Sequence, residues 1–118
     1  MERMTRDDIS QALRALGLAA GDVVMVHSSL RSIGYVEGGA DAVVDALLDV
    51  LGSSGTLVVP TFTPSHGHEA DPVFDPARDP SEVGRITEVV RTRPGARRSV
   101  HLLHSVAALG GRSAEIVG

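Results

Sequence analysis

The sequence contains no cysteine and no lysine, and each absence excludes a class of chemistry. Without cysteine, these 118 residues cannot form disulfides, thiolate metal sites or a cysteine nucleophile. All 11 basic residues are arginine, so the chain has no lysine amine for a Schiff base. It also lacks the lysine that a Walker-type phosphate loop requires. Schiff-base enzymes and Walker-type NTPases are therefore excluded for this chain.

Long apolar runs and a surplus of basic charge are also missing. No apolar run approaches the roughly 18 residues that are needed to span a bilayer. The first ten residues are charged and lack the apolar core of a secretion signal. The formal net charge of −4, from 15 acidic and 11 basic residues, argues against general nucleic-acid binding. We therefore expect a cytoplasmic protein that binds neither nucleic acid nor membrane.

The length of 118 residues predicts a single domain, and 42% apolar with 22% charged residues is typical of a globular chain. A new helix begins at Gly111–Ser113, shortly before the sequence stops at Gly118. We therefore expect residues 1–118 to be the N-terminal portion of a longer protein. A small domain with a frayed end is the alternative.

The first fifty residues predict a helix, a strand and a second helix. Thr5 and Asp8 are spaced as a capping box, an apolar stripe follows, and Gly17 is a natural helix end. We expect this first helix to cover one face of a sheet. The continuous apolar run Val23–Val26 is typical of a strand that is covered on both faces. Gly38–Asp41 then opens the second helix, which Gly52 ends.

The rest of the chain adds strands and a long irregular segment. A strand at Thr56–Val59, ended by Pro60, completes a strand–helix–strand unit with a parallel strand pair. Residues 61–80 contain four of the six prolines and no periodicity, so we expect a long functional or mobile loop. A third helix and a strand at Ser105–Leu109 follow. The predicted class is α/β, with a mixed or parallel sheet between helices in a three-layer-like arrangement.

The junction His27-Ser28-Ser29 is the most informative candidate site. In open parallel sheets, ligands bind where strands end at their carboxyl edge. Backbone amides and hydroxyls at such a junction suit a phosphate group or a thioester carbonyl. The alternative is that Ser28 and Ser29 only cap a turn. Gly34–Gly39 has the spacing of a phosphate loop, but Ala40 and Asp41 stand where lysine and serine or threonine are required.

Four further groups of polar residues are open to more than one interpretation. Arg97, Arg98 and Ser99 could bind phosphate or form a solvated turn. His101 and His104 could be ligands, acid–base groups or hydrogen-bond partners of nearby backbone. A histidine-rich loop could bind a metal, but solvated loop residues are the favoured interpretation and no metal is expected. The acids of the second helix are expected to serve solubility only. These groups are Arg97-Arg98-Ser99, His101 with His104, His66-Gly-His68-Glu69 with Asp71, and Asp41 with Asp45 and Asp49.

In this order the motifs resemble the aminoglycoside N3-acetyltransferase family. The most specific stretch is HSSLRSIGYVEGGAD over residues 27–41. It is supported by GTLVVPT at 55–61, VGRITE at 83–88, and RSVH at 98–101 followed by HSVAA at 104–108. The resemblance runs from about residue 4 to the end. It implies the α/β acetyltransferase fold of that family, here incomplete.

The resemblance also implies an activity and a set of contacts. The reaction is acetyl transfer from acetyl-coenzyme A to the 3-amino group of 2-deoxystreptamine antibiotics, which gives antibiotic resistance. Because the chain has no cysteine, we expect direct attack in a ternary complex. The polycationic antibiotic suits an acidic protein, with Asp71, Asp75, Asp79 and Glu82 as candidate contacts. The residues expected along the coenzyme are Ser28, Ser29, Gly34, Thr61, Arg98, Ser99, His104 and Ser105.

The sequence departs from the family pattern in two places. Leu102 stands where the family has proline after the histidine of the RSxH motif. Family members are also considerably longer, and their histidine base with its acidic partner is expected beyond Gly118. The chain is therefore predicted to bind the coenzyme but to turn over little alone. The alternatives are a truncated coenzyme-A binding remnant, or an unrelated small α/β hydrolase or metal enzyme. Oligomeric state stays open, although an incomplete sheet edge favours association.

Overall fold

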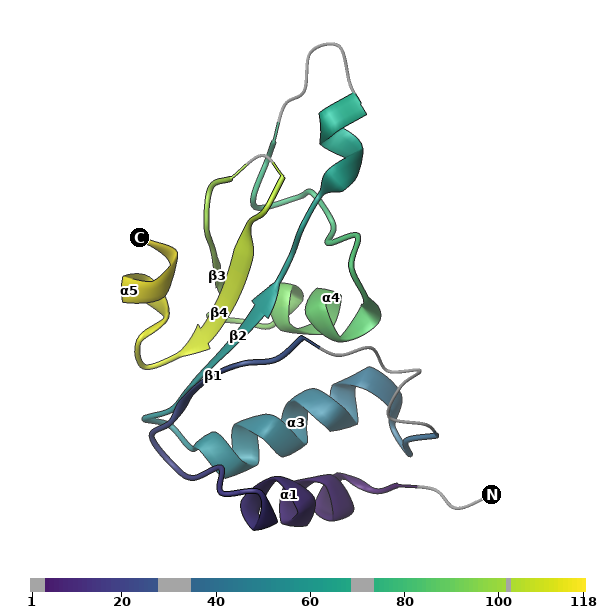
Figure 1. Cartoon of the computed structure of the whole chain (residues 1–118), viewed down its shortest axis with the longest axis vertical. Helices are drawn as coiled ribbons and strands as arrows, with labels where there is room; N and C mark the ends of the chain where they lie inside the picture. The colour runs from purple at the N-terminus through teal and green to yellow at the C-terminus, as the bar shows by residue number, and fades with distance from the viewer. Residues whose placement is uncertain (1–3, 28–34, 69–73, 102) are drawn as a thin grey trace.

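A computed structural model describes residues 4–27, 35–68, 74–101 and 103–118 (Figure 1). Its elements, in chain order, are α1 (Arg6–Ala15), β1 (Val23–Met25), α3 (Gly39–Leu51), β2 (Thr56–Pro60), the 3₁₀ helix η1 (Pro64–His68), α4 (Arg85–Thr92), β3 (Arg97–Arg98), β4 (Val106–Gly110) and α5 (Ser113–Val117). Among the described residues, no helix combines the length and the apolarity that crossing a bilayer requires.

The strands form one mixed sheet in the order β1-β2-β4-β3. β1 and β2 are parallel and are joined through α3, so the predicted strand–helix–strand unit is confirmed. β4 runs antiparallel to both β2 and β3. The α/β class with a mixed sheet is confirmed. β3 was not predicted, because a strand of two residues leaves no periodic pattern in a sequence.

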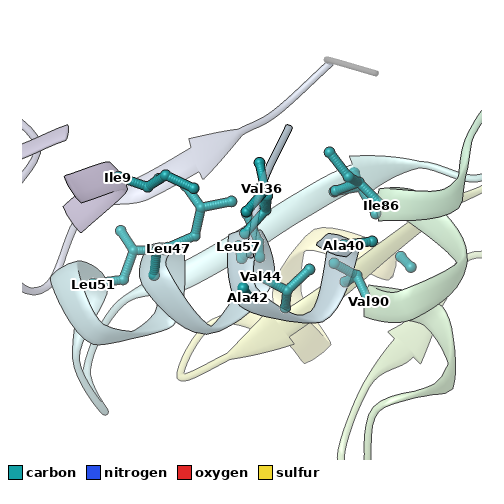
Figure 2. Packing of buried hydrophobic residues seen from close by; sticks show 14 residues of the cluster. Ile9, Val36, Ala40, Ala42, Val44, Leu47, Leu51, Leu57, Ile86 and Val90 are labelled. Carbon is teal, nitrogen blue, oxygen red and sulfur yellow. The ribbon is translucent and has the colours of Figure 1, made fainter. Parts of the chain in front are cut away.

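α3 carries the centre of the core. Eight of its residues are buried, and it packs against β2 on one side and α1 on another. Figure 2 shows its side chains meeting Leu57 of β2 and Ile86 and Val90 of α4. Gly38 precedes the helix and Gly52 ends it with a φ of 67°, as the glycine pattern predicted. α3 and α4 therefore cover the same face of the sheet, and apolar contacts hold them there.

The first helix lies in a different place from the one expected. Its capping box is present: the Thr5 hydroxyl accepts from the Asp8 amide at 3.2 Å, and the Asp8 carboxylate accepts from the Thr5 amide at 2.9 Å. However, α1 packs on α3 rather than over the sheet, with Ile9 buried and the Ser10 hydroxyl donating to the carbonyl of Ala46. The reason is that α3 is apolar on more than one side and offers α1 a second packing surface.

The acids of α3 also correct an expectation. Asp49 forms an ion pair with Arg6 at 2.6 Å. Arg93 forms ion pairs with Asp45 at 2.8 Å and with Asp41 at 3.2 Å. The carboxylates therefore join α1 and the end of α4 to α3, in addition to any effect on solubility. These pairs lie at the protein surface, where solvent screening weakens them.

β1 is not covered on both faces, contrary to the prediction from its continuous apolar run. Val23 and Met25 are 43% and 55% exposed, whereas Val24 packs against the core. β1 is an edge strand, and the face that carries Val23 and Met25 is partly open to solvent. A continuous apolar run therefore did not distinguish a doubly covered strand from an edge strand with one exposed face.

Two glycines close one end of the β2–β4 pair. Gly110 has a φ of 135°, and a Cβ atom on it would overlap the carbonyl oxygen of Gly55. The amide of Gly111 donates to that same oxygen at 3.1 Å. Backbone meets backbone here with no room for a side chain.

Candidate functional site

The candidate site lies at the edge of the sheet formed by the carboxyl ends of β1 and β2. This edge is at the other end of the strands from Gly55 and Gly110. β1 and β2 are parallel, so their carboxyl ends meet at this edge, and β4 starts there because Pro60 is paired with Val106. The carboxyl end of β3 lies at the same edge, since the Ser99 amide donates to the Val106 carbonyl. Segments far apart in the sequence therefore meet where ligands bind in α/β sheets.

A buried cluster of hydroxyls and one guanidinium forms the floor of this edge. The hydroxyls of Thr61 and Ser105 are 2.9 Å apart, and both side chains are fully buried. Nε of Arg98 donates to both, at 3.2 and 3.0 Å, and Nη2 donates to the carbonyl of Thr61 at 2.9 Å. The structure thus brings together three of the residues predicted from the sequence.

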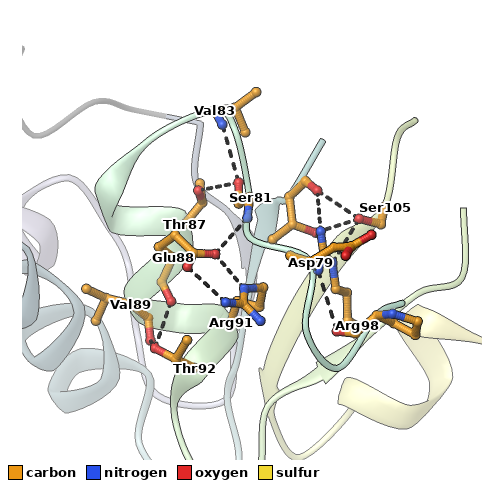
Figure 3. A network of polar contacts seen from close by, with 12 residues as sticks. Asp79, Ser81, Val83, Thr87, Glu88, Val89, Arg91, Thr92, Arg98 and Ser105 are labelled. Carbon is orange, nitrogen blue, oxygen red and sulfur yellow. Dashed lines mark hydrogen bonds and ion pairs between the residues drawn. The ribbon is translucent and has the colours of Figure 1, made fainter. Parts of the chain in front are cut away.

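Arg98 also connects the sheet to residues 74–79, the second part of the long loop at 61–80. Its Nη1 donates to the carbonyls of Asp79 and Pro76, and its guanidinium lies 4.7 Å from the centre of the Phe74 ring. Figure 3 shows Arg98 between Asp79 and Ser105. Because carbonyl oxygens, hydroxyl oxygens and one ring engage this side chain, at most one of its five N–H donors stays available. Burial lowers the pKa of Arg98, and the neighbouring Arg91 adds to this effect.

The turn between β3 and β4 holds the remaining predicted residues that the structure describes. The Ser99 hydroxyl accepts from the Val106 amide at 2.8 Å. Nδ1 of His101 accepts from the amides of Leu103 and His104, at 3.2 and 2.9 Å. Of the three roles considered for the histidine pair, the structure thus shows His101 engaged with nearby backbone. The exposed His104 ring stands edge-on to Phe62, with ring centres 5.0 Å apart.

Arg97 and Arg98 do not act as one pair. They are successive residues of β3, and successive side chains of a strand point to opposite faces. Arg97 is exposed, whereas Arg98 is half-buried in the cluster described above. A phosphate contact from this segment would therefore come from Arg97 or from backbone amides rather than from two adjacent guanidiniums.

Several predicted residues lie outside the described part of the chain. These are Ser28, Ser29 and Gly34 of the first junction, Glu69 and Asp71 of the histidine-rich loop, and Leu102. His27, the last described residue before the first gap, is exposed at the carboxyl end of β1. Within the described ranges, no group of three or more histidines and acids is placed to hold a metal ion.

The acids proposed as antibiotic contacts have partners within the chain. The Glu82 carboxylate accepts from the amide and the hydroxyl of Ser65, at 3.0 and 2.5 Å. The carboxylate of Asp75 caps the amide of Ala77, and that of Asp79 accepts from the Asp75 amide. These carboxylates hold together parts of the long loop at 61–80 and the residues directly after it.

A second polar network, which the sequence did not predict, lies beside the first at the start of α4 (Figure 3). Glu88 forms a two-point pair with Arg91, at 2.5 and 2.9 Å, and accepts from the Ser81 amide at 2.7 Å. The Ser81 and Thr87 hydroxyls are 2.8 Å apart. The hydrogen bonds from Arg91 lower the pKa of Glu88. The pairing of Glu88 with Arg91 could have been predicted, because residues at this spacing lie on one face of a helix. The contact of Ser81 with Glu88 could not, because it depends on the path of the loop.

With this geometry in place, comparisons with known proteins can be stated. The family model of aminoglycoside 3-N-acetyltransferases matches residues 25–118. Aminoglycoside N(3)-acetyltransferase VII of Streptomyces paromomycinus is 42% identical over 124 residues, which cover 91% of this chain and 43% of that relative. The chain thus spans less than half the length of this curated relative.

Solved structures agree with the sequence comparison. The structure of AAC-IIIb binary with CoASH superposes with a TM-score of 0.89 at 30% identity, over 99% of this chain and 50% of that one. The structure of sisomicin-bound AAC-VIa superposes with a TM-score of 0.86 at 32% identity, again over 99% and 50%.

Proposed function

The chain belongs to the aminoglycoside 3-N-acetyltransferase family, and on this premise we propose that its reaction is acetyl transfer from acetyl-coenzyme A to the 3-amino group of a 2-deoxystreptamine aminoglycoside. The observation that carries the proposal is the family match over residues 25–118. In a bacterial cell, such a transfer would confer resistance to the antibiotic. The alternative of an unrelated hydrolase or metal enzyme is thereby set aside.

The proposed chemistry is one displacement at the thioester carbonyl. The 3-ammonium group first loses a proton, and its nitrogen then attacks the carbonyl carbon. A C–N bond forms, the C–S bond breaks, the nitrogen releases its second proton to leave the neutral amide, and the departing sulfur takes up a proton as the free thiol. Because this chain has no cysteine to carry the acetyl group, the transfer is direct, with both substrates bound together.

We propose that the coenzyme lies along the sheet edge at which β1, β2 and β3 end. The residues proposed to form this coenzyme site are Ser28, Ser29, Gly34, Thr61, Arg98, Ser99, His104 and Ser105. The topology supports this assignment, because the described members of the set meet at one edge although up to 44 positions separate Thr61 from Ser105. Exposed groups of this set, such as His104, are the ones that can reach a ligand directly.

Within this set we assign Arg98 a positioning role. Its donors are occupied by Thr61, Ser105, Pro76 and Asp79, so it orders the wall of the site rather than gripping a phosphate with a two-point contact. A guanidinium suits this role, because its planar fork of donors fixes several acceptors at once.

A second candidate function is coenzyme binding without turnover. A positioned base typically contributes about 10²–10⁴-fold to an acyl transfer. None of the described imidazoles, those of His27, His101 and His104, forms an ion pair with a described carboxylate, so a base with a fixed acidic partner is not evident there. The chain also covers only 43% of a curated relative. Both observations favour binding with little turnover by these 118 residues alone.

The two candidates are separated by measuring thiol release and coenzyme binding on the same purified chain. Thiol release from acetyl-coenzyme A is followed with a panel of deoxystreptamine antibiotics. The control substrate is an antibiotic that is already acetylated on its 3-amino group. Coenzyme A binding is measured by isothermal titration calorimetry.

Release that depends on a free 3-amino group supports acetyl transfer by this chain. Binding without release supports the second candidate. A folded chain that neither binds coenzyme A nor releases thiol contradicts both candidates. These residues would then belong to the family without having its activity.

A further inference from the structure

The segment that leads into β4 has a main-chain partner on one side only. The amides of Thr61 and Thr63, which follow β2, donate to the carbonyls of Ser105 and Leu103, both at 2.8 Å. Successive residues of an extended chain bond to opposite sides. The main-chain amide of His104 therefore faces away from β2, toward the side of β4 on which β3 lies.

β3 is too short to reach this amide, and a side chain reaches it instead. Beyond the two residues of β3, the Ser99 amide still donates to the Val106 carbonyl at 2.9 Å. The amide of His104 is the next one on that side, because every second residue faces β3. Nδ1 of His101 accepts from it at 2.9 Å, and from the amide of Leu103 at 3.2 Å. An imidazole nitrogen thus takes the place that a strand carbonyl holds elsewhere in a sheet.

The main chain that His101 holds in this way carries the ring of His104. Ser105 is fully buried, whereas His104 is exposed, as the alternation of an extended chain requires. The His104 ring stands edge-on to Phe62, which lies opposite to it across the ladder, with ring centres 5.0 Å apart. The centre of the His101 ring is 5.5 Å from that of His104. An exposed ring is therefore held by hydrogen bonds to its main chain and by two neighbouring rings.

We propose that His101 is a positioning residue of the coenzyme site, which acts by fixing the main chain of Leu103 and His104 and thereby the ring of His104. This inference rests on the proposed function, in which His104 lines the coenzyme. A group that is ordered before the ligand arrives loses less conformational freedom on binding, so the bound complex is tighter. Because Nδ1 accepts from two amides, the neutral His101 ring carries its hydrogen on Nε2.

Two variants of His101 separate its acceptor from its ring. His101→Asn keeps an acceptor at the same number of bonds from Cβ, and asparagine commonly accepts from an amide two residues further on. His101→Phe keeps a ring and removes the acceptor. Val100→Phe is the matched control, because it places the same new side chain one residue away, at a position that is 80% exposed. For each variant, coenzyme A affinity is measured by isothermal titration calorimetry, and amide hydrogen exchange by NMR.

We expect His101→Phe to weaken coenzyme A binding about fivefold or more and to speed exchange of the Leu103 and His104 amides. His101→Asn should restore both to near the wild-type values, and Val100→Phe should change neither. The imidazole ¹⁵N shifts of the wild-type chain should place the hydrogen of His101 on Nε2. Equal exchange in the wild-type chain and His101→Phe, or a hydrogen on Nδ1, would overturn the proposal.

A double-mutant cycle tests whether His101 acts through His104. His104→Ala should weaken coenzyme A binding by itself, and His101→Phe should add no further loss in that background. Additive losses would overturn the positioning role, because His101 would then contact the coenzyme on its own. If the wild-type chain bound no coenzyme A, the proposed function would fail. Hydrogen exchange would then still decide whether His101 holds the turn.

Discussion

The two ends of the β2–β4 pair are built in opposite ways. At the end near α5, Gly55 and Gly110 bring backbone against backbone, with no space for a Cβ atom between them. At the other end, Thr61 and Ser105 direct hydroxyls toward each other, and Arg98 joins them to the segment 74–79. One end is closed by close packing, and the other is held by hydrogen bonds.

The difference shows how one sheet can be both closed and open to a ligand. A contact between glycine backbones closes one end of the strand pair but presents no side-chain functional groups. An end that is held by polar side chains leaves its loops to be shaped by hydrogen bonds, and such loops are where functional groups gather. The predictions below test this contrast, from the largest expected effect to the smallest.

Substitution Gly110→Ala should have the largest effect, because the new Cβ would collide with backbone that cannot move aside. Overpacking and strain at a positive φ together should lower the free energy of unfolding by about 3–5 kcal/mol, as measured by urea denaturation. Gly84→Ala is the matched control, since Gly84 has nearly the same φ but no atom within 4 Å of the place that a Cβ would take. It should cost only about 1–3 kcal/mol for the strain. Equal losses in the two variants would show that close packing does not seal this end.

Substitution Arg98→Met should be the next most costly change. It removes the donor to the buried Thr61 and Ser105 hydroxyls and to the carbonyls of the segment 74–79, which should lower the free energy of unfolding by about 2–3 kcal/mol. The same substitution at the exposed neighbour Arg97 should change it by less than about 0.5 kcal/mol. Protease cleavage within residues 69–80 should become faster only in the Arg98 variant. Unchanged cleavage in that variant would contradict the positioning role.

Substitution Thr61→Val keeps the shape of the side chain and removes one hydroxyl from the cluster. The Ser105 hydroxyl and Nε of Arg98 each lose a partner, so the free energy of unfolding should fall by about 1–2 kcal/mol. Thr92→Val, at an exposed position of α4, should change stability by no more than about 0.5 kcal/mol. The cluster would be dispensable if both variants unfolded at the same urea concentration.

The smallest expected effect is the dependence of stability on pH in the acidic range. Arg91 lowers the pKa of Glu88 below its ordinary value of 4.5, so the folded chain binds this proton less readily than the unfolded chain. The pair therefore stabilises the fold above about pH 4.5, and this stabilisation is lost as the pH falls through the lower folded pKa. Relative to wild type, Glu88→Gln should be less stable at pH 7, and the difference should shrink toward pH 3. A difference that is constant across this range would refute the assignment.

The sequence predicted those parts of the fold that depend on local signals. The capping box at Thr5, the glycine at position 52 that ends α3, and the parallel strand pair around α3 were all readable from residue type and spacing. The family itself was identified from motifs in their order along the chain, and the match over residues 25–118 confirmed it.

Tertiary structure alone decided which of these local features lie next to one another. The packing of α1 on α3, the exposed face of β1 and the pairing of Arg6 with Asp49 depend on contacts between distant segments. Most of the acceptors of Arg98 are main-chain carbonyls, which every residue carries and which no residue letter distinguishes. The sequence by itself therefore determined most of the elements, the family and the candidate residues, but not the short strand β3 or the 3₁₀ helix η1. Which of those residues hold one another in place was decided by the fold, because hydrogen-bond partners are set by position in space.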